Sequence, residues 1–385
     1  MQTGTIQSPT DSNRNDKTTP VNVAVFLDSM REFSNGCFFV RHFVPFIELG
    51  KRGNGTGFIS MPGYFFDEVV QDNDVVVFTR VYNSDPFRHI WRLKAAGMKI
   101  VYEFDDDVWN IPKVNPAHNT FQTKKFEVED MCREADAVIV STEPLADLVR
   151  KIKGFNKPVF VCPNSVSLEM FKPRKKAHDK LRIGWAGGAN HYEDLNFLMD
   201  IILELDKKYD FDFIIQGLSG SPLEADMYSK AMSIKRGQVN DKASKKHLNT
   251  ALDVWDKIRQ LKSFQHVPFY PPEMYPGILS SCDLDIGLIP ITNAKFNASK
   301  SCVKYYEYTA VGTTALASDL PPYKNEVQYK ARDKKDWIEK LSALIEDEKL
   351  REDILKKQQE YVFKERDIKV VGRLWEETYK KIKDL

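Results

Sequence analysis

Short apolar runs that alternate with helical stretches constrain this chain more than any other feature of its sequence. In the first half of the chain such runs lie at 21–27, 74–80, 98–104, 137–142 and 158–163, and most lead into a stretch with helical periodicity. Continuous apolar runs separated by helices are typical of a parallel sheet that is covered on both faces. The sequence therefore predicts an α/β fold with right-handed crossovers between its strands.

The same pattern restarts after a charged, proline-containing segment at 169–180, which we interpret as a linker. Apolar runs recur at 181–187, 211–217, 284–290 and 313–318, and the chain is helical and charged from 335 onward. We expect two αβ domains in series, Rossmann-like and facing each other across a cleft. Ligands of open parallel sheets bind beyond the carboxyl ends of the strands, so the residues that follow strands are the ones to inspect.

Composition excludes several classes of protein. The chain has 56 Lys and Arg against 55 Asp and Glu, so it is not basic throughout. None of its apolar runs approaches the roughly 18–20 residues that span a bilayer. The polar residues 1–20 lack the apolar core of a signal peptide and read as a disordered leader. The five cysteines form no CxxC pair, which argues against a zinc site or a disulfide framework and favours a cytoplasmic location.

A glycine turn follows the first strand of the second half, in the segment GWAGGANHYED at 184–194. Gly187 and Gly188 permit close backbone approach to a ligand, and the next helix offers free N–H groups to a phosphate. His191 could add a donor at the same place. The alternative is an ordinary strand-to-helix turn that needs glycine, and the segment alone leaves both readings open.

The segment 293–312 is the most informative stretch of the sequence. A helix is predicted to begin within it, at 299–301. Donors near the helix start would suit a diphosphate, and a carboxylate two turns later could accept hydrogen bonds from ribose hydroxyls. The candidate residues are Asn297, Ser299, Lys300, Ser301, Lys304 and Glu307. The alternative is an exposed ion pair between Lys304 and Glu307, worth a few tenths of a kcal/mol.

Three adjacent acids, Asp105, Asp106 and Asp107, end a strand of the first domain. Clustered carboxylates can orient acceptor hydroxyls, raise one another's pKa, or bind a divalent metal. The alternative is capping of the next helix, which one of the three is expected to do. Further candidates with weaker support at the same edge are Asp28, Arg80 and His118.

The pattern S-K-S-x-x-K-x-x-E-Y within 299–310 resembles the donor-site helix of GT-B glycosyltransferases, especially the GT4-like group. Matching stretches occur in the expected order at 135–149, 159–171, 181–195 and 282–290, and the terminal helices with Trp375 and Tyr379 resemble an extension that crosses back to the first domain. The resemblance implies a retaining enzyme that uses a UDP- or GDP-sugar and needs no obligate cofactor or metal. By this resemblance Glu307 holds the ribose of the nucleotide.

The chain departs from the family pattern at two places. Ser299 stands where the family has its first glutamate, and Gly187–Gly188 stands where many members have glycine followed by arginine. Lys300 or Lys304 would then supply the missing positive charge. The first departure supports an alternative in which the chain binds a nucleotide sugar without catalysing transfer.

The composition, the restart of the strand pattern and the resemblance together give the expected domain boundaries. They are a leader at 1–20, an N-terminal acceptor domain at 21–168, the linker at 169–180, a C-terminal nucleotide-sugar domain at 181–365, and a helix at 366–385 that packs back on the first domain. The acceptor stays open among a glycan, a protein, a lipid and a modified nucleic acid.

A basic insertion occupies 229–262, where nine Lys or Arg face three Asp, an excess of six positive charges. Such a stretch could contact a phosphate backbone or another anionic surface, which would support a modified DNA base as the acceptor. The alternative is a solvated helical insertion, which the sparse aromatic residues of this stretch favour.

Overall fold

The computed structural model describes residues 19–27, 36–60, 73–80, 87–113, 115, 118–174, 177–219, 221, 223–237 and 242–385. Most of the expected leader, Asp28, and residues 238–241 of the basic insertion lie outside these ranges. Within them, no helix combines the length and apolar character that crossing a membrane requires.

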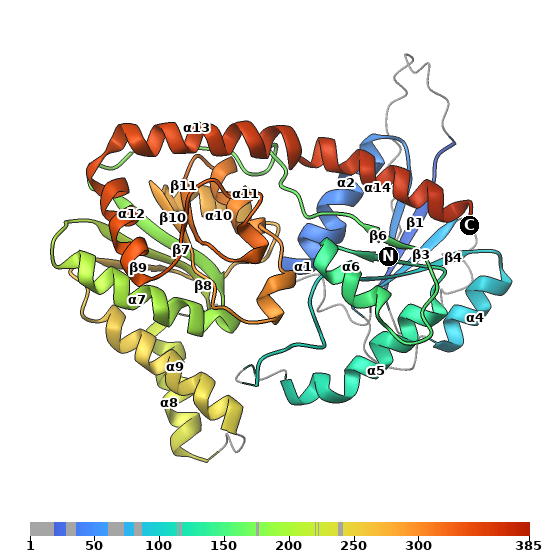
Figure 1. Cartoon of the computed structure of the whole chain (residues 1–385), viewed down its shortest axis with the longest axis horizontal. Coiled ribbons are helices and arrows are strands. Elements are labelled where there is room, and N and C mark those ends of the chain that lie inside the picture. The colour runs from blue at the N-terminus through green and yellow to red at the C-terminus, as the bar shows by residue number, and fades with distance from the viewer. Residues whose placement is uncertain are drawn as a thin grey trace, which may run out of the picture.

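The first domain is built on a parallel six-stranded sheet with the order β2-β1-β3-β4-β5-β6 (Figure 1). Its strands are β1 (Asn22–Leu27), β2 (Gly55–Ser60), β3 (Val75–Thr79), β4 (Lys99–Phe104), β5 (Ala137–Val140) and β6 (Val159–Val161). Its helices are α1 (Gly36–Phe38), the π-helical turn η2 (Phe39–Phe43), α2 (Val44–Lys51), α4 (Phe87–Ala95), α5 (His118–Glu134) and α6 (Glu143–Arg150). The strands β3 and β5 are buried along their whole length, as continuous apolar runs require.

The second domain repeats this architecture with the strand order β12-β11-β10-β7-β8-β9. Its strands are β7 (Arg182–Gly188), β8 (Asp212–Leu218), β9 (Phe264–Val267), β10 (Ile286–Ile289), β11 (Thr314–Ser318) and β12 (Lys330–Ala331). Its helices are η3 (Ala189–His191), α7 (Tyr192–Asp206), α8 (Leu223–Lys235), α9 (Lys242–Ile258), α10 (Tyr275–Cys282), η4 (Phe296–Ser299), α11 (Val303–Ala310), η5 (Pro321–Tyr323) and α12 (Lys334–Glu346). The order reverses between β7 and β10, which is where doubly wound sheets bind their ligands.

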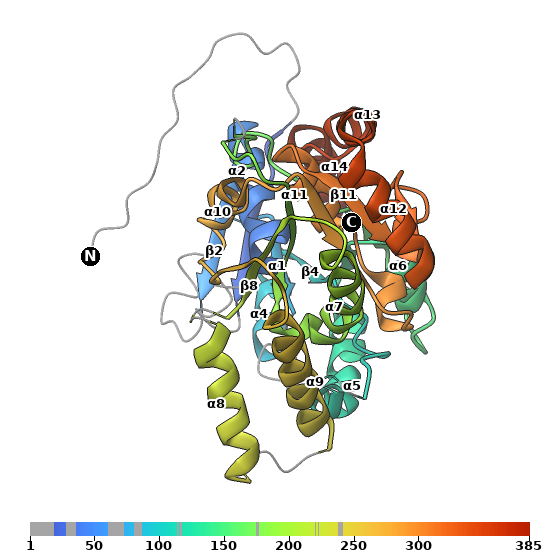
Figure 2. The same ribbon diagram turned by 90° about the vertical axis from the view of Figure 1, so that its left-hand side faces the viewer.

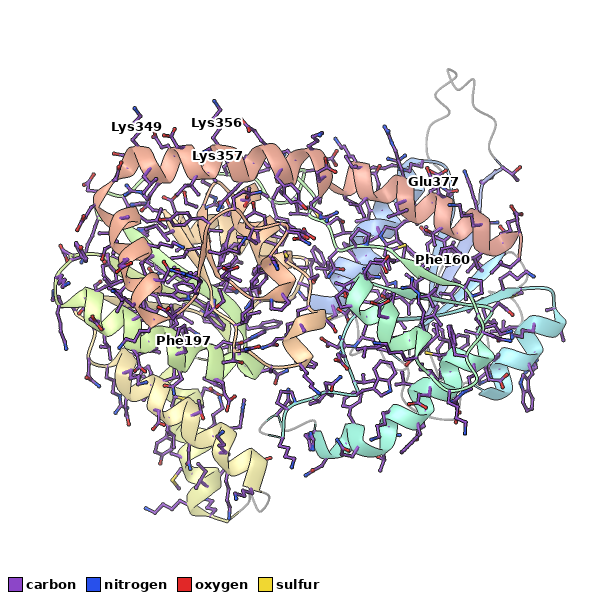
Figure 3. The ribbon with its side chains drawn as sticks, viewed as in Figure 1. Phe160, Phe197, Lys349, Lys356, Lys357 and Glu377 are labelled. Carbon is purple, nitrogen blue, oxygen red and sulfur yellow. The ribbon has the colours of Figure 1, made fainter. Side chains whose placement is uncertain are left out.

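Two terminal helices, α13 (Glu348–Glu365) and α14 (Ile368–Lys383), run along one side of both domains (Figure 1). Gln358 of α13 ties this helix to the second domain, because its amide bonds the backbone N–H and C=O of Ala315 at 3.0 and 2.8 Å. Trp375 and Tyr379 of α14 belong to the same apolar core as Val23 of β1. Figure 3 shows Lys349 and Lys356 pointing away from the body on the outer face of α13.

The predicted fold class is confirmed, with two six-stranded parallel sheets and C-terminal helices that return to the first domain. Local boundaries differ in one important place. The helix expected from 299–301 begins only at Val303, because η4 ends at Ser299 and Lys300 is extended. Lys300 and Ser301 therefore lie on a loop and do not share a helical face with Glu307.

The basic insertion forms a helical hairpin, α8 and α9, that projects away from the second sheet (Figures 1 and 2). Several of its positive charges are neutralised within the domain. Ion pairs join Lys230 to Asp226, Lys246 to Glu193, Lys257 to Asp200 and Arg259 to Asp256. Among the residues placed by the structure, the exposed basic side chains of α8, of α9 and of the turn after α8 that form no ion pair are Lys235, Arg236, Lys242 and Lys245, which lie at the tip of the hairpin.

Candidate functional site

Two adjoining cavities lie where the carboxyl ends of the two sheets face each other. The first cavity, of about 410 Å³, is lined by Asp105 and Asn164 of the first domain and by Gly187, Lys304 and Glu307 of the second. The second cavity, of about 350 Å³, is lined by side chains that include Arg80, Phe121, His247, Phe296 and Asn297. Residues shared by both cavities are Cys37, Asp106, Asn190, His191 and Lys300. Ligands in the two cavities would therefore contact a common set of residues.

Bare backbone forms one wall of the first cavity. A Cβ on Gly187 would lie 2.7 Å from the Lys304 ammonium, so the glycine lets that charge approach the turn. Gly217 on the adjacent strand has a φ of 98°, and a Cβ there would lie 2.2 Å from the Gly187 carbonyl oxygen. A Cβ on Gly188 would meet nothing within 4 Å, so that residue leaves open space. Gly217 was not predicted, although it ends an expected strand.

His191 is held by a carboxylate. Its Nδ1 lies 2.9 Å from an oxygen of Asp194, whose other oxygen accepts the Thr292 N–H at 2.7 Å. The positive charge of Lys304 and burial lower the pKa of His191 to about 4. The imidazole is therefore neutral near pH 7, with Nδ1–H donating to Asp194 and a lone pair left on Nε2.

Lys304 and Glu307 both titrate near neutrality. Burial, aided by Lys300, lowers the pKa of Lys304 to about 8, and its ammonium lies 4.7 Å from the centre of the Trp185 ring. Burial raises the pKa of Glu307 to about 7, although its carboxylate accepts a hydrogen bond from the Tyr275 hydroxyl at 3.0 Å. Lys304 and Glu307 form no ion pair with each other, and Glu307 is only 6% exposed. Both observations argue against the alternative of an exposed ion pair between them.

The loop before α11 divides the remaining candidates. Lys300 lines both cavities, and its ammonium lies 4.9 Å from the centre of the Phe296 ring. Asn297 lines the second cavity while its amide donates to the Thr292 carbonyl at 2.8 Å. Ser301 lines the first cavity, whereas Ser299 is buried outside both, and its carbonyl accepts a hydrogen bond from Thr142 of the first domain at 2.9 Å.

The three aspartates separate into two groups. Asp105 and Asp106 pair with Arg80 at 3.3 and 3.5 Å, and burial raises the pKa of Asp105. Asp107 is 2% exposed, and one of its carboxylate oxygens accepts the backbone N–H groups of Trp109 and Asn110, each at 3.1 Å. Asp107 lines neither cavity and stabilises a turn, whereas the expected capping of a helix does not occur here, because the next helix, α5, begins only at His118.

The same edge offers three grouped metal-ligand atoms, since those of Cys37, Asp105 and Asp106 lie within 4.8 Å of one another. The guanidinium of Arg80 already pairs with both carboxylates and offsets part of their charge. Burial and Asp105 raise the pKa of the Cys37 thiol well above its usual value, so the sulfur keeps its proton. These side chains suit hydrogen bonding to a neutral ligand better than cation binding.

Two candidates with weaker support have different outcomes. Arg80 lines the second cavity from a backbone conformation with a φ of 50°, which is uncommon for a residue with a side chain. His118 lies at the start of α5, where its Nδ1 is 2.7 Å from the Ile111 carbonyl, and it lines neither cavity.

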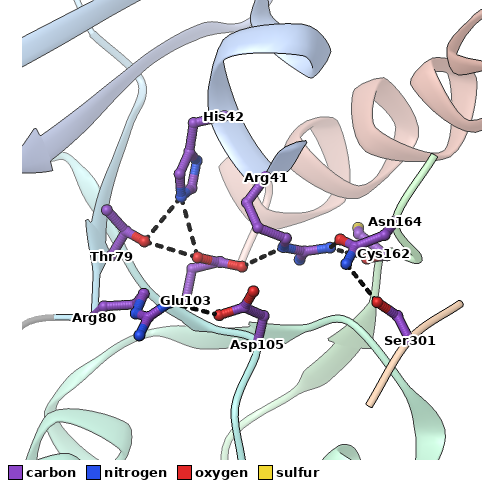
Figure 4. Close-up of polar contacts among 9 residues, drawn as sticks. All are labelled: Arg41, His42, Thr79, Arg80, Glu103, Asp105, Cys162, Asn164 and Ser301. Carbon is purple, nitrogen blue, oxygen red and sulfur yellow. Dashed lines mark hydrogen bonds and ion pairs between the residues drawn. The ribbon is translucent and has the colours of Figure 1, made fainter. Parts of the chain in front are cut away.

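A buried network beneath the first cavity was not predicted (Figure 4). The guanidinium of Arg41 on η2 donates to Glu103 at 2.6 Å and to Asn164 at 2.9 Å. Burial opposes ionisation of Glu103, but Arg41 and His42 lower its pKa to about 2. The available signal was polar residues within apolar stretches of the sequence, namely Arg41 and His42 within 37–49 and Glu103 within the run at 98–104.

The sequence matches no protein-family model and no curated protein. The structure does resemble solved structures across most of its length. A sucrose-phosphate synthase from Thermosynechococcus elongatus has a TM-score of 0.61 at 12% identity, and the match covers 94% of this chain and 99% of that one. Anabaena Alr3699/HepE in complex with UDP and glucose has a TM-score of 0.63 at 11% identity, covering 94% and 100%.

An alpha-glucosyltransferase in complex with UDP-glucose and DNA containing an abasic site has a TM-score of 0.64 at 11% identity, again covering 94% of this chain and 100% of that one. At these identities the likeness concerns the fold. This chain therefore has the two-domain GT-B fold that these glycosyltransferases share.

Proposed function

We propose that the protein transfers a glycosyl residue from a UDP-sugar to an acceptor hydroxyl. The observation that carries this proposal is the composition of the first cavity. It brings a backbone-lined turn, a buried lysine and a buried glutamate of one domain against carboxylates of the other. The solved structures of the same fold that contain UDP or UDP-glucose add support.

In this proposal the second domain holds the donor. The Lys300 and Lys304 ammonium groups and the Ser301 hydroxyl bind the diphosphate, close to the backbone of Gly187 and Gly188. Glu307 accepts hydrogen bonds from the ribose hydroxyls, as the family resemblance implies.

The acceptor occupies the second cavity and reaches the donor at the shared residues. Asp106, which lines both cavities, and Asp105, which lines the first, are held by Arg80 and orient the acceptor hydroxyl where it reaches the donor. We infer a retaining transfer without an obligate metal, in which the leaving diphosphate takes the proton of the acceptor hydroxyl. The protein contributes positioning and stabilisation of the charge on the diphosphate.

A thermal-shift screen of UDP- and GDP-sugars tests the donor assignment, because a ligand that binds only the folded state raises Tm. We expect selective stabilisation by a UDP-sugar. The variant Glu307→Ala should lose this stabilisation and sugar transfer, while Glu352→Ala, at an exposed position on α13, should keep both. Normal transfer by Glu307→Ala would refute the assignment. Donor binding without nucleotide release across an acceptor panel would favour a non-catalytic binding protein.

A nucleic acid is the second candidate acceptor, and the exposed basic tip of the α8–α9 hairpin favours it. His247 of α9 lines the second cavity, so the hairpin borders the proposed acceptor site. One neighbour of the same fold was solved with DNA.

Fluorescence anisotropy with duplex DNA at several salt concentrations tests this candidate. The triple variant Lys235→Gln, Lys242→Gln, Lys245→Gln should reduce the salt dependence of binding by about three released counterions. The matched control Lys349→Gln, Lys356→Gln, Lys357→Gln, at exposed positions of α13, should leave it unchanged. Equal effects of the two triple variants, or no DNA binding at all, would reject a nucleic-acid acceptor.

A further inference from the structure

The buried network around Arg41 fixes the orientation of an amide. Arg41 is 2% exposed, and its Nη1 lies 2.9 Å from the side-chain oxygen of Asn164. A guanidinium can only donate hydrogen bonds, so the Asn164 atom that faces it must be the carbonyl oxygen. This contact removes the usual ambiguity between the oxygen and nitrogen of an asparagine amide.

The fixed amide in turn assigns the hydrogen bond of Ser301. The nitrogen of Asn164 then faces the Ser301 hydroxyl, at 2.7 Å. An amide N–H can only donate, so the Ser301 oxygen accepts this bond, and the proton of the hydroxyl is left for another partner. Ser301 lines the first cavity beside Lys300 and Lys304, where that partner would be an anion.

The guanidinium that starts this chain of contacts is held from several sides (Figure 4). Its Nε donates to Glu103 at 2.6 Å, and Nη1 also donates to the Cys162 carbonyl at 2.5 Å. The ring of Trp375 on α14 lies 4.8 Å from it. The Asn164–Ser301 hydrogen bond joins the first domain to the loop before α11 in the second domain. It therefore forms only when that loop lies against the first domain.

We propose that Arg41 is a positioning residue that acts through Asn164 and commits the Ser301 hydroxyl to donate to the diphosphate of the nucleotide sugar. This inference rests on the proposed function, because it requires a diphosphate in the first cavity. It adds to that function a physical link by which the folded first domain and α14 set the hydrogen bonding of the donor site.

A double-mutant cycle measured with UDP-glucose by calorimetry tests the link. Asn164→Ala and Ser301→Ala should each weaken UDP-glucose binding about tenfold, the order expected for a hydrogen bond to a charged group. The double variant should bind no more weakly than Ser301→Ala, because Asn164 acts only through Ser301. The proposal would be overturned if the double variant bound UDP-glucose about a hundredfold more weakly, the product of the two single effects. It would also be overturned if neither single change weakened binding.

The role of Arg41 requires a variant that can fold. Removing Arg41 alone would leave the buried Glu103 carboxylate without its guanidinium partner, so Arg41→Gln is combined with Glu103→Gln. This pair should weaken UDP-glucose binding about as much as Asn164→Ala, and adding Asn164→Ala should weaken it no further. Normal binding by the pair would remove Arg41 from the link.

Thr378→Val is the control for general destabilisation. Thr378 is 3% exposed and accepts a hydrogen bond from the Cys162 thiol at 3.6 Å, so it lies at the same contact of α14 without reaching Asn164. It should lower Tm without changing affinity, and a parallel loss of affinity would reduce the network to a structural role. If the unaltered protein does not bind UDP-glucose, the proposed function fails as well. If the unaltered protein binds but the cycle is multiplicative, only the link fails.

Discussion

The two groups in the first cavity that titrate near neutrality predict a bell-shaped pH dependence of donor binding. Glu307, with a pKa of about 7, can accept hydrogen bonds from ribose hydroxyls with both of its oxygens only when it is ionised. Lys304, with a pKa of about 8, attracts the diphosphate only when it is protonated. Affinity for UDP-glucose should therefore rise as Glu307 loses its proton and fall as Lys304 loses its own.

The magnitude follows from the fractions of the two competent forms. At about pH 6 roughly a tenth of Glu307 is ionised, whereas at about pH 7.5 roughly three quarters of each group is in its competent form. Affinity should thus increase about sixfold between these values and decrease about sixfold again by about pH 9. Binding near pH 7 should also release about half a proton, because Glu307 must ionise.

Calorimetry with UDP-glucose in two buffers of different ionisation enthalpy measures both quantities. UDP itself is unsuitable, because a terminal phosphate titrates near pH 6. The variant Glu307→Gln should lose the rise between about pH 6 and pH 7.5 but keep the fall at higher pH. His191, with a pKa of about 4, does not titrate in this range. If Glu307→Gln retains the acid limb, another group is responsible and our placement of the ribose is wrong.

Three further predictions concern stability and turnover. The native pKa of Glu307 is above its unfolded value, so ionisation of this group lowers the stability of the protein as pH rises from about 4.5 through about 7. In urea unfolding, Glu307→Gln should therefore be more stable than the unaltered protein at about pH 8, by on the order of 3 kcal/mol. At about pH 4 the two proteins should be equally stable. Gly217→Ala should cost about 2 kcal/mol or more in the free energy of unfolding because of its φ of 98° and a 2.2 Å backbone contact, whereas Gly188→Ala should stay within about 0.5 kcal/mol. Asp107→Ala should lower the free energy of unfolding by about 1–2 kcal/mol and leave kcat unchanged, because Asp107 stabilises the turn. Asp106→Asn should lower kcat at least about tenfold and leave Tm unchanged, because Asp106 lines the cavities. The opposite pair of results would show that we have exchanged the roles of the two aspartates.

Much of the fold could be predicted because strands buried on both faces must be apolar throughout. This condition located β1, β3, β4 and β5 to within a residue or two. It failed for β2, whose sequence GTGFIS at 55–60 contains two glycines and no continuous apolar run. The start of α11 was also predicted wrongly, because the Ser-Lys-Ser sequence at 299–301 resembles the start of a helix although Lys300 is extended.

Site residues that follow strands could be predicted for a related reason. The carboxyl ends of parallel strands share one edge, so Asp105 after β4 and Gly187 at the end of β7 were expected at the ligand-binding edges of their two sheets, and both line the first cavity. The Arg41 network could not be predicted, since its partners lie 62 and 123 residues from Arg41 in the sequence. The near-neutral pKa values of Glu307 and Lys304 were equally inaccessible, because they depend on burial that only tertiary packing creates.

The basicity of the residues that the two cavities share bears on the proposed proton transfer. A general base works best when its pKa lies near the operating pH. The free nitrogen of His191 belongs to an imidazole with a pKa of about 4, because the ammonium of Lys304 disfavours a second positive charge. The carboxylate of Asp106 is paired with Arg80, and the Cys37 thiol holds its proton. The His191 imidazole and the Cys37 thiol can form hydrogen bonds with an acceptor hydroxyl, but neither is poised to take its proton near pH 7. A leaving diphosphate in the first cavity would lie beside the same residues, which is the arrangement that our proposed transfer requires.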